Sequence, residues 1–289
     1  MNNSIVFIHK SNVKDSVQKQ SFIKTVLECA QHFNPEKKII FIGDNHNEQF
    51  AVGDNVIFKN MDKMGKSHEY FTKFNSRFRS VRGRNAPFND LMIKFFFERF
   101  IYMYMVMEEY GMDSYWTFDT DTLIIDDLTK HESKFQDYDC TSQCNAMCLN
   151  GFVKTETLRK YVEHIIDLFD DKDYLEENQR EFDTIHPGYA LTEMRFYAHF
   201  KNNTDLNSID LSTPINGETF DHCLKQNLGP NRDSENTWES QDGMKKIYEK
   251  EDGLYFKFDD NFVKVITMNL SWMGNDAFTS LFEKSKKSQ

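Results

Sequence analysis

The stretch YWTFDTDTLIIDD (residues 115–127) ends an apolar run on two carboxylates, Asp119 and Asp121, spaced two residues apart. Residues 114–118 (SYWTF) have the aromatic and β-branched composition of a strand, and we expect a central strand that delivers both Asp at its C-terminal end. Ligands of open α/β sheets bind at the carboxyl ends of strands. The position of the acidic pair therefore suits a functional site.

The segments around this strand predict an α/β protein. An apolar strand is expected over residues 4–10, a helix over 16–32 and a second strand over 37–44, an order that favours a parallel sheet. Residues 60–87 are polar and basic, and predict either a flexible loop over an anionic ligand or a solvated connector. We expect the remaining elements as strands at 55–59, within 137–153, and at 247–249, 254–258 and 262–268, and as helices at 87–112, 155–169 and in the second half of 186–200.

Composition excludes some classes of function. The formal net charge of −11 argues against a nucleic acid as the main partner. The five Cys are odd in number and lack the spacing of a zinc ribbon or finger, so we expect reduced, partly buried thiols. The sequence predicts neither a signal peptide nor a transmembrane segment, and the expected location is the cytoplasm, which would be the host cytoplasm for a viral protein.

The acidic pair alone has three interpretations. Carboxylates at i and i+2 of a strand share one face, and oxygen ligands of this kind suit Mg²⁺ or Mn²⁺ bridging to a substrate phosphate. A solvated acidic turn explains the same letters. So does the first motif of the haloacid-dehalogenase phosphatases, in which Asp119 would be the nucleophile and Asp121 the general acid. That superfamily's later acidic motif is similar to FIGDNHNE (41–48), but here this element precedes the acidic pair instead of following it.

The order of motifs along nearly the whole chain resembles the GT-A fold, D-x-D-containing nucleotide-sugar glycosyltransferases of bacterial and viral type. The resemblance implies an α/β, Rossmann-like mixed and mainly parallel sheet flanked by helices. It implies a single domain over 1–289, with a nucleotide-sugar-binding half at 1–130 and an acceptor-binding half at 131–289. The residues that carry it are Lys94 and Arg99 in the long helix, FDTD (118–121), LNGF (149–152), LTEMRFY (191–197), FDHCLKQN (220–227) and NLSWMGND (269–276).

The resemblance implies that Asp119 and Asp121 hold Mn²⁺ or Mg²⁺ and the donor diphosphate, with Asp121 the more direct ligand. The second acidic pair, Asp126 and Asp127, is then expected to be a solvated strand end. Such a site would move a sugar, a hexose or a pentose, from a UDP- or GDP-sugar to a hydroxyl of a glycan, glycoprotein or glycolipid acceptor.

Three further residues receive roles from the same resemblance. Glu193 lies where GT-A enzymes place an acidic residue beside the acceptor, and would be the general base of an inverting enzyme or would shape the acceptor site of a retaining one. A carboxylate that merely stabilises a helix N-terminus is the alternative for Glu193. Lys94 and Arg99 would contact donor phosphate or brace the acidic motif, although Lys94 is also spaced to pair with Glu98.

Two residues complete the implied donor site. Asp44, at the end of the second strand, would accept a hydrogen bond from the base or ribose, and a turn-forming Asp is the alternative. Gly151, in the LNGF segment, is assigned to donor binding by the resemblance alone.

One departure from the family pattern concerns the metal. Ser271 occupies the position where the family usually has a His as third metal ligand. We expect Ser271 in the metal set, with coordination completed by water, Asn269, Asn275 or Asp276, or else weaker metal binding. His222 is expected to be a structural histidine. The same departure motivates a second hypothesis, a non-catalytic module that binds a nucleotide-sugar or a glycan.

Overall fold

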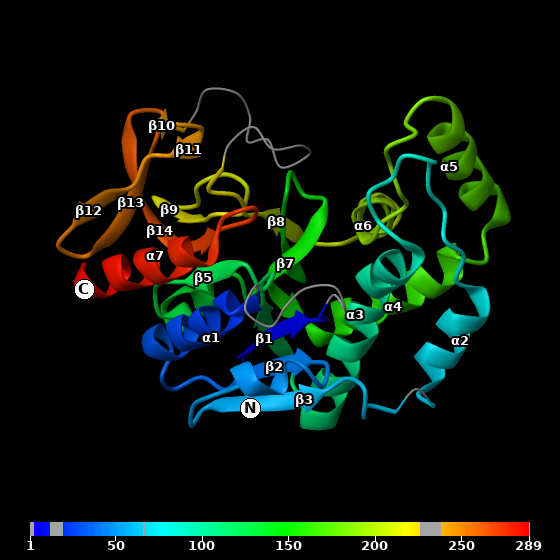
Figure 1. Cartoon of the computed structure of the whole chain (residues 1–289), viewed down its shortest axis with the longest axis horizontal. Coiled ribbons are helices and arrows are strands. Elements are labelled where there is room, and N and C mark those ends of the chain that lie inside the picture. The colour runs from blue at the N-terminus through cyan, green and yellow to red at the C-terminus, as the bar shows by residue number, and fades with distance from the viewer. Residues whose placement is uncertain (1–2, 12–19, 66, 226–237, 289) are drawn as a thin grey trace. The chain divides into compact units, whose positions relative to one another are not determined.

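A computed structural model describes residues 3–11, 20–65, 67–225 and 238–288 of the chain (Figure 1). The chain divides into two compact units. The first comprises Met1–Asp62, Ser114–Val153 and Asn207–Gln289, and the second comprises Lys63–Asp113 and Lys154–Leu206. Both units take segments from either side of residue 130. The two compact units therefore do not coincide with the expected donor half at 1–130 and acceptor half at 131–289, and the roles of those halves stay a prediction.

The first unit contains a seven-stranded sheet in the order β3-β2-β1-β4-β7-β6-β8. Strand β1 pairs in parallel with β2 and β4, β2 with β3, and β6 with β8, whereas β6 and β7 are antiparallel. This architecture confirms the predicted class, α/β with a mainly parallel sheet and flanking helices. The strands are β1 (Ser4–His9), β2 (Ile39–Gly43), β3 (Val56–Asn60), β4 (Ser114–Thr117), β6 (Cys140–Gln143), β7 (Cys148–Lys154) and β8 (Ser208–Asp210).

The central strands are buried along their length, which explains their sequences. All five residues of β2 are buried, and so are the first four of β1. A parallel sheet is covered on both faces, so its inner strands are continuous apolar runs and do not alternate. The strands predicted at 4–10 and 37–44 are confirmed for this reason, with ends one or two residues shorter.

A second sheet in the same unit positions the C-terminal part of the chain. Strand β5 pairs antiparallel with β14, and Asn269 lies opposite Thr122. This pairing brings the residues after β14 beside the acidic pair. The strands of this second sheet are β5 (Thr122–Ile124), β9 (Glu218–Phe220), β12 (Tyr248–Lys250), β13 (Gly253–Phe258) and β14 (Asn261–Asn269). The same unit also contains the separate hairpin of β10 (Ser240–Gln241) and β11 (Met244–Lys245). Its helices are α1 (Phe22–Phe33), α7 (Asn275–Lys287) and the short 3-10 helices η2 (Glu48–Phe50) and η3 (Leu128–Lys134).

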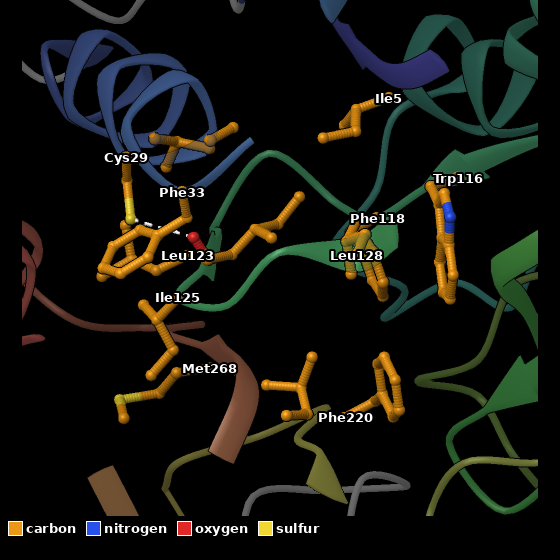
Figure 2. Packing of buried hydrophobic residues seen from close by; sticks show 14 of the residues in the cluster. Ile5, Cys29, Phe33, Trp116, Phe118, Leu123, Ile125, Leu128, Phe220 and Met268 are labelled. Atoms are coloured by element: carbon orange, nitrogen blue, oxygen red, sulfur yellow. Dashed lines mark hydrogen bonds between the residues drawn. The ribbon is translucent and has the colours of Figure 1, made fainter. Parts of the chain in front are cut away.

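Aromatic and aliphatic side chains join the two sheets of the first unit into one core (Figure 2). The Trp116 ring stacks on that of Phe220, with centroids 5.9 Å apart and planes at 10°. The Cys29 thiol donates to the Ile124 carbonyl across 3.3 Å, and burial raises the pKa of that thiol. All five cysteines are buried thiols, where partly buried ones were expected. Helices α1 and α7 lie side by side (Figure 1), with the Phe22 and Phe278 rings 4.9 Å apart.

The second unit is helical. Its longest helix, α3, begins after Asn89, whose side chain accepts from the Met92 amide, and ends at Gly111, which has a left-handed φ of 58°. The predicted helix at 87–112 is thus confirmed. Its buried residues lie between Ile93 and Met107, whereas Leu91 in the first turn is 75% exposed. The helices are α2 (Glu69–Arg77), α3 (Asp90–Tyr110), α4 (Thr155–Leu168), α5 (Lys172–Thr184) and α6 (Glu193–Asn202).

The loop or connector predicted over 60–87 is wrong for its middle part, where α2 forms. Tyr70, Phe71 and Phe74 bury one face of this helix, and the His68 ring accepts from the Tyr70 amide. Three apolar residues among many charges give a weak helical pattern in sequence. Among the described residues of the chain, no helix has the length and apolarity needed to cross a membrane.

Candidate active site

The acidic pair lies in the turn between β4 and β5, at the carboxyl edge of the main sheet. The Thr122 amide donates to the Asp119 carbonyl across 3.0 Å and closes the turn. His9, the last residue of β1, places its Nδ1 atom 2.9 Å from the hydroxyl of Thr120. The neighbouring parallel strands β1 and β4 therefore end together at this turn, which is the position expected from the sequence.

The Asp121 carboxylate is held by two side chains from the end of β14. Its Oδ1 atom accepts from the side-chain amide of Asn269 at 2.8 Å, and its Oδ2 atom accepts from the Ser271 hydroxyl at 2.7 Å. The Ser271 amide donates to Asn269 Oδ1 at 3.0 Å, so the two residues also hold each other. Ser271, predicted to be near a metal, does lie against a predicted metal ligand.

The electrostatics of this turn disfavour a negative charge on both carboxylates at once. Burial, and next the negative charge of Asp119, raise the pKa of Asp121 to about 6, while the hydrogen bonds from Ser271 and Asn269 oppose the rise. Both of these donors are neutral, so they satisfy the oxygens without cancelling the charge. A cation beside the pair would relieve the repulsion.

A buried ion pair contacts Asn269, one of the two residues that hold Asp121. The Lys245 ammonium lies 2.6 Å from Asp221 Oδ1, and both side chains are essentially inaccessible to solvent. The other carboxylate oxygen of Asp221, Oδ2, accepts from the backbone amide of Asn269 at 3.3 Å. The Lys245 ammonium also lies 4.5 Å from the centroid of the Trp238 ring. Asp221 lies in the segment FDHCLKQN, which the family resemblance includes, whereas no local pattern in the sequence gives a signal for Lys245.

Two predicted donor-binding residues have structural roles in the first unit. Asp44 is buried, and its Oδ2 and Oδ1 atoms accept from the Ser11 amide at 2.6 Å and the His46 amide at 2.9 Å, so it has the turn-forming role that is the alternative to nucleotide binding. Gly151 has φ of 93°, and a Cβ there would come within 2.1 Å of the Thr141 hydroxyl. Nucleotide binding by Asp44 and Gly151 stays a prediction.

The residues proposed to complete metal coordination are also placed. Asn275 donates from Nδ2 to the Ser21 hydroxyl at 2.8 Å, which ties the start of α7 to the start of α1. His222 is 4% exposed, as expected of a structural histidine. In residues 3–11, 20–65, 67–225 and 238–288, no group of three His, Cys, Asp or Glu side chains is arranged to hold a metal ion.

One residue of the second acidic pair, Asp126, differs from the prediction. Asp126 is 3% exposed, so the expected solvated strand end is wrong for this residue. Its Oδ2 atom lies 3.6 Å from His131 Nε2 and 3.4 Å from the Lys264 ammonium. His131 in turn lies 3.1 Å from Glu218 through Nδ1. These partners come from η3, β14 and β9, and their approach is set by tertiary structure.

Three predicted site residues belong to the second unit. Arg99 on α3 donates to Glu193 Oε1 across 2.8 Å, and the Tyr161 hydroxyl donates to the Glu193 backbone carbonyl at 2.8 Å. Glu193 is the first residue of α6, the position of its helix-terminal alternative. Lys94 lies 3.4 Å from Glu98, as its spacing predicted. Arg99 therefore reaches a carboxylate, and the catalytic role of Glu193 stays a prediction.

Comparisons with known proteins give structural similarity alone. No family model matches the chain, and no curated protein matches it. Mouse xyloside xylosyltransferase 1 in its apo form is 9% identical over 72% of this chain and 84% of that chain, with a TM-score of 0.48. The galactosyltransferase LgtC, solved with donor and acceptor sugar analogs, is 12% identical over 98% of this chain and 96% of that chain, with a TM-score of 0.45. CMP:2-keto-3-deoxy-manno-octonic acid synthetase complexed with CTP is 10% identical over 62% of this chain and 86% of that chain, with a TM-score of 0.35. These values leave the function to be inferred from the residues of this chain.

Proposed function

We propose that the chain is a metal-dependent GT-A glycosyltransferase that moves a sugar from a nucleoside-diphosphate sugar to a hydroxyl of a glycan-type acceptor. The observation that carries the proposal is the turn after β4, where Asp119 and Asp121 lie at the carboxyl edge of a mainly parallel sheet and Asp121 is fixed by Asn269 and Ser271. This edge is where open α/β sheets bind ligands.

The side chains at this turn fit a hard divalent cation. Asp119 and Asp121 offer carboxylate oxygens and Ser271 offers a hydroxyl, and oxygen ligands are those that Mg²⁺ and Mn²⁺ prefer. These three residues would hold the ion, with water completing the coordination. When bound, the ion would supply positive charge that offsets the charge developing on the leaving diphosphate. Burial, and next the negative charge of Asp119, raise the pKa of Asp121, and both make a cation at this turn favourable.

The other assignments follow the same proposal. Asp44 and Gly151 would contribute to the nucleotide site, and Lys94 and Arg99 to donor phosphate or to bracing. Glu193 would act on the acceptor hydroxyl, with Arg99 holding its carboxylate in one orientation. The donor would be a UDP- or GDP-sugar, and the acceptor a glycan, glycoprotein or glycolipid.

A non-catalytic module that binds nucleotide-sugars or glycans is the second candidate. It is favoured by one observation, the hydrogen bond that Ser271 already makes to Asp121 at a position where the family pattern has a metal-binding His. Such a module would bind the donor without releasing or transferring its sugar, and Glu193→Gln would not change its behaviour.

A haloacid-dehalogenase-like phosphatase is the enzymatic alternative. The pKa of about 6 for Asp121 would suit a general acid. Stable modification of Asp119 by beryllofluoride, a mimic of an aspartyl phosphate, would favour this alternative, and its absence under Mg²⁺ would favour the transferase.

A thermal-shift panel tests the proposal. UDP, GDP and CMP are each added with and without Mn²⁺ to the wild-type protein and to Asp121→Ala. We expect one nucleoside diphosphate to raise the melting temperature of the wild type only when Mn²⁺ is present, because a ligand that binds only the folded state stabilises it. The variant should show no such shift. A wild-type protein that responds to none of the nucleotides would contradict the proposal.

A further inference from the structure

We propose that Trp272 is an aromatic platform on which a pyranose ring stacks beside the acidic turn. The inference deepens the proposed function and rests on it for the location of the diphosphate. The ring could belong to the donor sugar or to the acceptor. Trp272 follows Ser271, the residue whose hydroxyl binds Asp121.

The backbone of Trp272 is strained. Its φ is 67°, in the left-handed region that bulky L residues rarely adopt. In the described part of the chain, every other non-glycine residue with positive φ is Asn, Asp, Cys or Ala, which tolerate this region better or have small side chains. Strain of this kind persists where surrounding structure enforces it, and it is concentrated at functional sites.

The enforcing contacts come from the segment that holds Asp121. The Ser271 amide donates to Asn269 Oδ1 at 3.0 Å, and the Met273 amide donates to the Leu270 carbonyl at 3.0 Å. The Lys225 ammonium donates to the Trp272 carbonyl at 3.1 Å. The backbone is thus bonded before, at and after Trp272. The backbone conformation of Trp272 is therefore set by the same segment that holds Asp121.

The indole itself contributes little to the core. Trp272 is 75% exposed, whereas Trp116 and Trp238 are 0% and 5% exposed. An indole buries a large apolar area when it packs, so leaving one in solvent on a strained backbone stabilises nothing in the free protein. The combination of strain and exposure is explained if a ligand covers the ring.

The chemistry of the neighbouring residues selects a sugar. In a nucleoside-diphosphate sugar the glycosyl ring is attached directly to the diphosphate, whereas the base is separated from it by the ribose. Ser271 binds the carboxylate that is proposed to hold the diphosphate. An aromatic residue next to Ser271 is therefore expected to lie nearer to the sugar, which is bonded to that diphosphate, than to the base, which lies beyond the ribose. One face of a pyranose carries mainly C–H groups and can cover an indole, while its hydroxyls remain available to polar side chains.

Acrylamide quenching of tryptophan fluorescence tests the inference. The protein has three Trp, and Trp272 is the exposed one, so the quenching reports mainly on its indole. The ligands are UDP-galactose, UDP-xylose and GDP-mannose with Mn²⁺, then UDP and GDP with Mn²⁺, and finally free lactose. We expect at least one sugar-bearing ligand to lower the quenching constant about twofold or more, while UDP and GDP leave it unchanged.

Two variants separate a ligand-binding role from a structural one. Trp272→Asn places at this position a residue that tolerates positive φ, so its melting temperature should equal or exceed that of the wild type while its sugar binding is weakened at least fivefold. Phe262→Ala removes another partly exposed aromatic, on β14, and should leave sugar binding unchanged. A melting temperature that falls in Trp272→Asn with sugar binding intact would show a structural role and overturn the inference.

The outcomes distinguish this inference from the proposed function. Protection by lactose supports the inference and identifies an acceptor sugar, and protection by a nucleotide sugar alone identifies the donor sugar. Protection by UDP or GDP equal to that by their sugars shows base stacking and overturns it. If no sugar-bearing ligand protects Trp272, it is overturned even when the thermal-shift panel is positive. If lactose protects Trp272 but that panel is silent, the inference stands and the transferase fails.

Discussion

Ser271 donates its hydroxyl to Asp121 across 2.7 Å, although the two residues are 150 positions apart in the chain. The contact depends on the antiparallel pairing of β5 with β14, which places Asn269 opposite Thr122. The serine therefore orders the acidic turn whether or not it also binds a metal. The structure thus distinguishes the hydrogen bond by which Ser271 orders the turn from its proposed metal binding, which the sequence alone does not.

Substitution of Ser271 tests both roles. Ser271→Ala removes one hydrogen bond to a carboxylate, a contact that contributes about 1–3 kcal/mol, and should weaken Mn²⁺ binding about tenfold or more. Ser271→His supplies an imidazole ligand and should tighten Mn²⁺ binding above pH 7. Isothermal titration with Mn²⁺ measures both changes. If the affinity is the same in all three proteins, Ser271 is not at the metal site.

The buried ion pair of Lys245 and Asp221 is predicted to be costly to break. Lys245→Met leaves a buried carboxylate without its charged partner, so we expect the free energy of unfolding to fall by about 3–5 kcal/mol. The double variant Lys245→Met/Asp221→Asn should recover part of this loss, because it removes the orphaned charge. Urea unfolding measures both. A double variant less stable than Lys245→Met would show that the charge itself is not the cause.

His131 predicts a pH dependence of stability. Burial lowers the pKa of this imidazole, but Asp126 and Glu218 outweigh burial, and the pKa is raised above 6.5. The stabilisation by the imidazolium is therefore complete below pH 6.5 and is lost as the pH rises through the folded-state value. The free energy of unfolding should fall between pH 6 and pH 9 more steeply in the wild type than in His131→Gln. Parallel slopes in the two proteins would contradict this.

Asp121 should change the stability in the same direction as His131, but in a lower pH range. Because its pKa is raised to about 6, the metal-free protein should become more stable as the pH falls from about 6 toward the ordinary value of 3.8. Asp121→Asn should lose this gain. Thermal unfolding in a chelating buffer at pH 7 and pH 5 measures it, and a wild type and variant with equal shifts would show that Asp121 is already neutralised.

Much of the fold could be predicted from local patterns. The continuous apolar runs of β1 and β2 are typical of buried parallel strands, and the long apolar segment at 87–112 predicts the helix α3. The position of Asp119 and Asp121 at a strand end followed from the same patterns. Each of these inferences needs only neighbouring residues, and each is confirmed by the structure.

The remainder depends on long-range contacts. Burial of Asp126 requires His131 and Lys264, and the latter lies on β14, far along the chain. The support of Asn269 by Asp221 and Lys245 likewise combines separate strands and a hairpin. Nothing in the local spacing of these residues indicates that they meet. Their identification therefore needed the structure.

The most direct test of the central claim is sugar transfer itself. Wild-type protein and Asp121→Asn are incubated with UDP- and GDP-sugars, a glycan acceptor and Mn²⁺, and nucleoside diphosphate release is measured before and after addition of a chelator. We predict Mn²⁺-dependent release by the wild type from at least one donor, reduced at least 100-fold in the variant and abolished by the chelator. Equal release by the wild type and Asp121→Asn, or release unaffected by the chelator, would contradict the assignment of this turn as the catalytic metal site.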